Sequence, residues 1–152
     1  MSKSILRNYL EYDKRGRNKK QFDYLSTGCF LYEGKYLVSD SCSIVALNDT
    51  RGLEVKEDLL GINLHYKSMQ ENKVTFTELN TRLIKEDKRE AIPLDIDNYE
   101  LNVKLAQRVI KLIKANKVEV LKDTIYDYAH PIIKISNDKT GEIGLLLPMK
   151  KY

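Results

Sequence analysis

The chain has 152 residues, of which 42% are hydrophobic and 32% are charged. This length suits one domain whose core needs no disulfides or metals. The 2 cysteines cannot form a disulfide framework, and no CxxC spacing indicates a zinc site. No apolar run approaches the ~18 residues that span a bilayer, and the first residues lack the apolar stretch of a signal peptide. We therefore expect a globular protein of a reducing compartment.

The net charge of +4 comes from 26 Lys and Arg against 22 Asp and Glu. Such a mild excess predicts solubility and does not by itself indicate a nucleic-acid partner. The distribution of the charge along the chain is therefore more informative than the total.

A short helix is predicted for residues 4–12, because apolar residues recur at helical spacing from Ile5 to Leu10. It is followed by residues 14–20, which hold five cations and no acid. This segment has no apolar periodicity, so we expect a loop or a frayed helix end.

Three strands are predicted next, at residues 25–32, 36–39 and 43–47. Enrichment in Val, Ile, Tyr and Phe supports them, and Gly34 favours a hairpin turn between the first two.

Residues 49–90 give weaker patterns. Alternation predicts a half-buried strand at residues 73–77, whereas the charge-dense residues 82–89 indicate a solvated loop or edge. Residues 91–96 alternate as well, and Pro93 favours an edge strand or a strand end there.

The clearest predicted element is a helix over residues 98–115. Asp97 and Glu100 have the spacing of a capping box, and Asn116 is a suitable stop. The apolar residues at helical spacing are Leu101, Leu105, Val109, Leu112 and Ile113.

Strands follow at residues 117–122, 131–136 and 142–147, the last two joined by a turn at 137–141. The chain therefore predicts helix–β–β–β followed by β–helix–β–β–β, which is an α+β fold. We expect one domain with two subdomains, 1–72 and 73–152. Each subdomain gives one helix to the same face of a curved antiparallel sheet.

Three stretches resemble one domain of the bacterial DNA polymerase sliding clamp. Residues 131–135 and 144–150 are similar to the clamp's closing hairpin and its Met-Pro-Met-Arg-type ending. Residues 99–120 resemble its last helix and the strand after it, and residues 35–47 resemble its strand-turn-strand. The family's usual Gly is replaced by Ser41, and residues 49–90 match no part of the pattern.

The resemblance implies a DNA-clamp-like fold of two β-α-β-β-β-type subdomains, with helices that face double-stranded DNA in the hole of a ring. Clamp rings contain six domains, so this chain would need six copies to encircle DNA, which makes a homo-oligomer one expectation. A single clamp-like domain would suit a phage or another mobile element acting in the cytoplasm of a bacterial host.

A basic stripe is the first candidate site. Lys104, Arg108, Lys111 and Lys114 recur at steps of four, three and three, opposite the apolar residues of the predicted helix. No acid occurs nearby, although like charges at this spacing cost about 0.2–0.5 kcal/mol per pair. The stripe is either a phosphate-contacting surface or an ordinary solvated face.

The basic run near the N-terminus is the second candidate. Cations at this density suit phosphate contact through counterion release, although nuclear localisation or solubility would also explain them. The candidate DNA-binding residues here are Arg7, Lys14, Arg15, Arg17, Lys19 and Lys20.

The closing segment Leu147, Pro148 and Met149 has a role implied by the resemblance. In clamps it helps to wall an apolar groove that receives short peptide motifs of polymerases and other DNA-handling proteins, and flexible Met suits such a site. The alternative is a strand end covered by a loop.

No enzyme, cofactor or metal site is expected. His65 and His130 have no paired carboxylates in a motif, and no P-loop, GxGxxG or GxSxG occurs. The sequence predicts a DNA-associated, non-enzymatic processivity or recruitment factor. The alternative hypothesis is a protein-interaction module that mimics or caps a host sliding clamp, and a small enzyme is the weakest.

Overall fold

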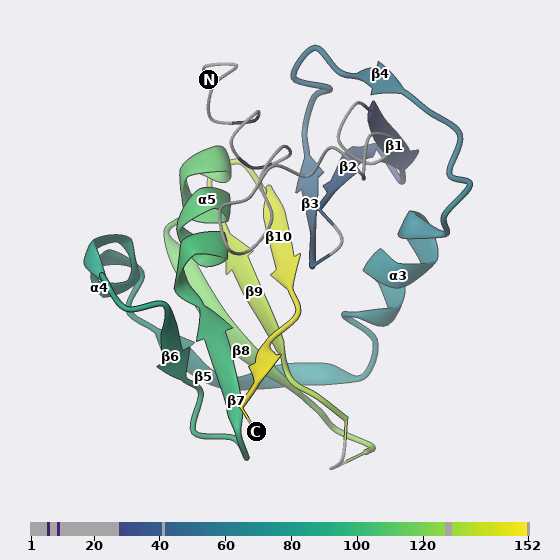
Figure 1. Ribbon diagram of the computed structural model, residues 1–152. Coiled ribbons are helices and arrows are strands. Elements are labelled where there is room, and N and C mark those ends of the chain that lie inside the picture. The colour runs from purple at the N-terminus through teal and green to yellow at the C-terminus, as the bar shows by residue number, and fades with distance from the viewer. Residues whose placement is uncertain (1–5, 7–8, 10–27, 41, 127–128, 152) are drawn as a thin grey trace.

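The computed structural model describes residues 6, 9, 28–40, 42–126 and 129–151. In chain order, the elements with defined bounds are β1 (Gly28–Tyr32), β2 (Lys35–Ser39), β3 (Ser43–Leu47), β4 (Glu54–Val55), α3 (Ile62–Ser68), β5 (Lys73–Leu79), α4 (Thr81–Glu86), β6 (Ala91–Pro93), β7 (Tyr99–Asn102), α5 (Val103–Ile113), β8 (Lys117–Asp123), β9 (Ile132–Ser136), β10 (Ile143–Leu146) and β11 (Met149–Lys150). The mixture of helices with mostly antiparallel strands confirms the predicted α+β class (Figure 1).

The main sheet has eight strands in the order β4-β1-β2-β3-β10-β9-β8-β5. Two three-stranded meanders, β1-β2-β3 and β8-β9-β10, meet at the antiparallel pair β3–β10. The order is therefore symmetric about that pair, with β4 and β5 as the outer strands. All neighbouring pairs are antiparallel except β1–β4, which is parallel.

The sheet has apolar side chains on both faces, because its central strands are covered on both sides. All five residues of β3 are buried, and its four apolar residues alternate between two clusters. Val45 and Leu47 join the cluster of α5, whereas Ile44 and Ala46 join the cluster of α3. The two helices thus pack on opposite faces.

The helix predicted over residues 98–115 begins five residues later than expected. Residues 99–102 form β7, which pairs with β6 and β11, and the helix starts at Val103. The proposed capping box at Asp97 is wrong, because the N-cap is Asn102, whose side chain accepts from the Leu105 amide at 3.0 Å. The apolar Leu101, used as a helical position in the prediction, is instead a buried strand residue.

The segment 82–89, expected to be a loop or an edge, contains most of the short helix α4. Asn80 caps this helix by accepting from the Leu83 amide at 3.1 Å. Its charged residues are exposed, which explains why composition suggested a loop, whereas Ile84 enters the core cluster at 3% exposure. Helix α3 was not predicted at all.

Leu6 and Tyr9 are helical, buried and part of the α5 cluster. They agree with the expectation that the first helix and the long helix share one face of the sheet. The rest of the predicted helix 4–12 and the first residues of the predicted strand 25–32 lie outside the described residues. The expectation of two helices on one face was incomplete, because α3 covers part of the other.

A second sheet of three strands, in the order β11-β7-β6, lies beside the main one (Figure 1). It ties the closing segment to the start of α5, since Met149 pairs with Glu100 and the Lys151 amide donates to the Asn98 carbonyl at 2.7 Å. Strand β7 then continues directly into α5.

Candidate functional site

The first candidate surface is the solvent side of α5. The helix is fixed at its C-terminal end by Asn137, whose side-chain amide donates to the Ile113 and Lys114 carbonyls at 3.0 Å each. It also lies very close to β10: a Cβ on Gly144 would approach Val109 Cγ1 to 2.5 Å. Its orientation on the sheet is therefore well defined.

The predicted basic residues of this helix differ in exposure. Lys104, Lys111 and Lys114 are exposed, and none forms an ion pair with another described residue. Arg108 is half-buried and has an interaction partner. Three cations are thus available to a polyanion, and the fourth is partly engaged.

Helix α4 lies beside α5, an arrangement that the sequence did not predict (Figure 1). Gln107 of α5 joins the two: its Nε2 donates to the Ile84 carbonyl at 2.9 Å and to the Asp87 carbonyl at 2.8 Å. These carbonyls belong to the C-terminal end of α4, where a short helix leaves acceptors unsatisfied. The sequence did not indicate that Gln107 connects two helices, because it is a single uncharged residue among the cations of this face.

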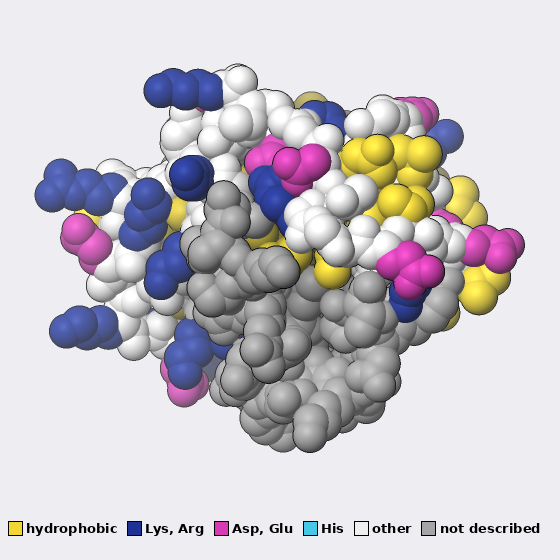
Figure 2. Space-filling model, turned by 90° about the horizontal axis from the view of Figure 1, so that it is seen from above, with side chains coloured by type: hydrophobic (Ala, Val, Ile, Leu, Met, Phe, Trp, Pro, Cys, Tyr) yellow, Lys and Arg dark blue, Asp and Glu magenta, His cyan; other side chains and the backbone are white. Residues whose placement is uncertain are grey.

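Lysine and arginine side chains gather over the side of the molecule that holds α4 and α5 (Figure 2). On α4 and the turn after it, Lys85 and Lys88 are exposed and form no ion pair with a described residue. Arg89 is paired with Asp87 at 2.8 Å, and this contact lowers the pKa of the Asp87 carboxyl. The basic character therefore extends beyond the predicted stripe.

The predicted DNA-binding residues near the N-terminus, Arg7, Lys14, Arg15, Arg17, Lys19 and Lys20, lie outside the described residues. Tyr9, which is described, belongs to a series of buried side-chain hydrogen bonds. Its hydroxyl lies 2.7 Å from Ser43 Oγ, which donates to Asp40 Oδ1 at 2.7 Å. Burial, with a further contribution from the charge of Asp40, raises the pKa of the Tyr9 phenol well above its ordinary value. The Tyr9 phenol is therefore uncharged, and its hydrogen bond connects Tyr9 to Ser43 of β3.

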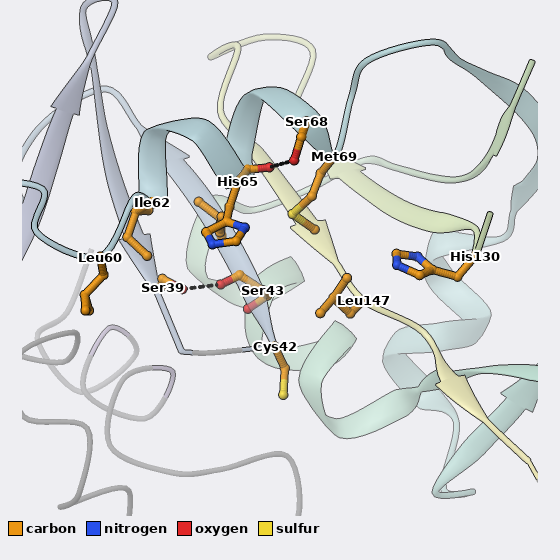
Figure 3. Close-up of a pocket in the computed structure, with 11 residues that line it drawn as sticks. Ser39, Cys42, Ser43, Leu60, Ile62, His65, Ser68, Met69, His130 and Leu147 are labelled. Carbon is orange, nitrogen blue, oxygen red and sulfur yellow. Dashed lines mark hydrogen bonds between the residues drawn. The ribbon is translucent and has the colours of Figure 1, made fainter. Parts of the chain in front are cut away.

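The second candidate surface is a cavity of about 460 Å³ between α3, the β2–β3 turn and the closing segment (Figure 3). Leu147 is one of the residues that line it. Pro148 and Met149 are not among its lining residues, and Met149 is half-buried in β11. The cavity thus includes one of the three predicted peptide-binding residues.

The other walls of the cavity come from residues that the sequence did not bring together. Helix α3 contributes Ile62 and His65, its C-cap residue is Met69, and the segment before β9 contributes His130 (Figure 3). Asp58 holds the start of α3 by accepting from the Ile62 amide at 2.7 Å and the Asn63 amide at 2.8 Å. The sequence did not predict α3, and this helix is what brings residues of the weakly patterned segment 49–90 against the sheet.

Hydrogen bonds connect several residues that line the cavity. Ser39 Oγ donates to the Ser43 carbonyl at 2.8 Å, and the Leu147 amide donates to the Cys42 carbonyl at 2.9 Å. Leu60, at the rim, is 50% exposed. A preformed cavity with an apolar lining and a few hydroxyl and imidazole groups is suited to receive an apolar side chain with a polar neighbour.

Among the described residues, no group of three or more His, Cys, Asp or Glu side chains could hold a metal ion. No helix in the described ranges has both the length and the apolar character needed to cross a membrane.

Comparisons with protein-family models, with curated proteins and with solved structures found no match for this chain.

Proposed function

We propose that this protein is a DNA-associated, non-enzymatic factor with a sliding-clamp-like architecture, acting in processivity or in recruitment on double-stranded DNA. The observation that carries the proposal is the combination of the symmetric strand order with the basic face of α5. Leu6 and Tyr9 pack on the same face of the sheet as α5, which is the arrangement required of clamp helices that face one duplex.

Phosphate contact explains the exposed lysines of α5 better than a structural role does. Lys104, Lys111 and the C-cap Lys114 do not support the helix through ion pairs with described residues, and Lys111 and Lys114 have the i,i+3 spacing at which like charges repel each other. A polyanion would remove that repulsion. Contacts of this kind give affinity without sequence preference, because Lys and Arg on backbone oxygens carry no base information.

The test is the binding of a fluorescently labelled random duplex by the whole protein at several salt concentrations. The logarithm of the binding constant should fall by about 0.9 per log unit of salt for each phosphate neutralised. Changing Lys104→Glu and Lys111→Glu together should flatten this slope by about one unit per lost contact, and equally for unrelated duplexes. Unchanged binding by the double variant would show that the stripe is an ordinary solvated face.

The oligomeric state distinguishes a ring that encircles DNA from recruitment by a single domain. A protein that encircles DNA needs several copies, which light scattering over a concentration series, with and without duplex, would detect. A persistent monomer would exclude a ring and leave recruitment by a single domain.

A second candidate function rests on the cavity beside Leu147. An apolar cavity at the closing segment supports the alternative in which the protein mimics or caps a host clamp and takes its peptide partners. Leu147→Ala should weaken the binding of a clamp-binding peptide. Its side chain is 39% exposed, so the melting temperature should change little. Absence of peptide binding by the unmodified protein would exclude this function.

A further inference from the structure

Helix α4 and the turn after it offer cations that the proposed DNA contact does not yet use. Lys85 and Lys88 are exposed, and neither forms an ion pair with a described residue. Of the acids nearby, Glu86 lies 3.9 Å from Arg82 and Asp87 is held by Arg89, whereas Glu90 is exposed and forms no ion pair with a described residue. Two exposed lysines thus lie next to the helix that carries the stripe of α5.

The position of α4 depends on α5. A helix of 6 residues is too short to be stable alone, and this one is held by the Asn80 cap, by burial of Ile84 and by Gln107. Gln107 lies between Lys104 and Lys111 in the helix that carries the stripe, and its amide binds the carbonyls of Ile84 and Asp87. The glutamine therefore fixes the lysines of α4 relative to those of α5.

We propose that α4 and the turn at residues 87–89 form a second phosphate-contacting element, which Gln107 positions beside the lysine stripe of α5. The partner is the sugar-phosphate backbone of duplex DNA, recognised by charge complementarity along two adjacent elements. This inference rests on the proposed function.

The turn itself is ordered in a way that suits such a contact. Asp87 accepts from the Arg89 amide at 2.8 Å and from its guanidinium, and these bonds hold the backbone from Asp87 to Arg89 in one conformation. Lys88 is the residue between them and is exposed. A fixed turn reduces the entropy that is lost when its lysine binds a phosphate.

The experiment compares three charge-reversal pairs in the duplex-binding assay. The test pair is Lys85→Glu with Lys88→Glu, the reference pair is Lys104→Glu with Lys111→Glu, and the control pair is Lys67→Glu with Lys151→Glu. The control residues are exposed, and Lys67 is on α3, across the sheet. The test pair should flatten the salt slope by about one to two units, and the control pair should not.

The outcomes separate this inference from the proposed function. If the reference pair weakens binding and the test pair behaves like the control pair, α4 is not a contact and this inference alone is wrong. If the parent protein binds no duplex, the proposed function fails and this inference fails with it.

Gln107 is tested by Gln107→Met, which keeps the length of the side chain and removes its donors. The salt slope should fall as in the test pair, and adding Lys85→Glu and Lys88→Glu to this variant should flatten it little further. The reference pair should remain additive with Gln107→Met. A variant that loses thermal stability but keeps the parent's salt slope would show that Gln107 has a structural role only.

Discussion

The two faces of the main sheet differ in how completely they are covered. On one face, α5 with Leu6 and Tyr9 closes a large cluster that includes fully buried strand residues. On the other, α3 covers a smaller cluster and leaves a cavity of about 460 Å³ beside it. Leucines of α3 and the segment before it remain exposed, with Leu59 at 67% and Leu64 at 74%.

The two candidate surfaces therefore have different physical origins. The exterior of the closed face is basic along α5, which is why we propose a polyanion as its partner. The open face has a cavity lined by apolar side chains beside α3, which is suited to an apolar group. Variants at matched positions on the two faces test this comparison.

The largest effect is expected from truncating a leucine of the closed face. Leu105→Ala should lower the free energy of unfolding by about 2–5 kcal/mol, because the side chain is 1% exposed and its loss leaves a cavity. Leu64→Ala on the open face should change it by less than about 0.5 kcal/mol. Urea denaturation measures the free energy of unfolding of both variants. A similar loss for Leu105→Ala and Leu64→Ala would contradict the difference in packing between the two faces.

Overpacking the contact between α5 and β10 should lower the free energy of unfolding somewhat less. Gly144→Ala brings a methyl group against Val109, so we expect a loss of about 1–3 kcal/mol in the free energy of unfolding. Val109→Ala removes the clashing atom. In a double-mutant cycle by urea denaturation, the second substitution should therefore recover part of the first loss, and strict additivity would show that α5 does not lie this close to β10.

The buried polar chain gives the third effect. Ser43→Ala removes the hydroxyl that contacts Tyr9 and Asp40, both buried, and should cost about 1–3 kcal/mol. The control is Ser68→Ala in α3, where an exposed hydroxyl donates to the His65 carbonyl at 3.1 Å. Thermal unfolding should show a clear loss for Ser43 and almost none for Ser68.

The smallest effect concerns pH at the end of β8. The Tyr126 and Ile125 amides donate to Asp123, and these bonds, with Lys73 nearby, lower the pKa of its carboxyl below 3.8. A lowered folded pKa means stability that is complete above the unfolded value and lost as pH falls through the folded one.

Asp123→Asn should therefore reduce the melting temperature slightly at pH 7, and the difference from the parent should shrink below about pH 4. A constant difference across this range would show that the carboxylate charge does not contribute.

The strands of the two meanders were predictable because they are rich in β-branched and aromatic residues, and because Gly34 and Gly141 mark two of the turns between them. Strand β3 was predicted at residues 43–47 and is observed there. The start of α5 was not, because Asp97 and Glu100 imitate a capping box while the pairing of β7 with two other strands overrides that local preference. Tertiary pairing of this kind leaves no local pattern.

The basic stripe of the candidate site came from periodicity alone, since Lys104 and Lys111 are two turns apart. The cavity could not be found in the same way. Its walls come from α3, the β2–β3 turn and Leu147, segments far apart in sequence that only the sheet brings together. The role of Gln107 could not be predicted from the sequence either, because its hydrogen bonds depend on where α4 ends.

The central pair β3–β10 has a consequence for how the chain folds. The Asn48 amide beside it bonds to Glu142 Oε2 across 94 positions of sequence, and every hydrogen bond of the pair spans a similar distance. Local meanders form quickly, whereas contacts of such high order form late and slowly. During synthesis, β3 therefore emerges as an uncovered strand edge long before β10 is made. We expect the nascent chain to be most prone to aggregation in that interval, when its most apolar strand has no neighbour on that side.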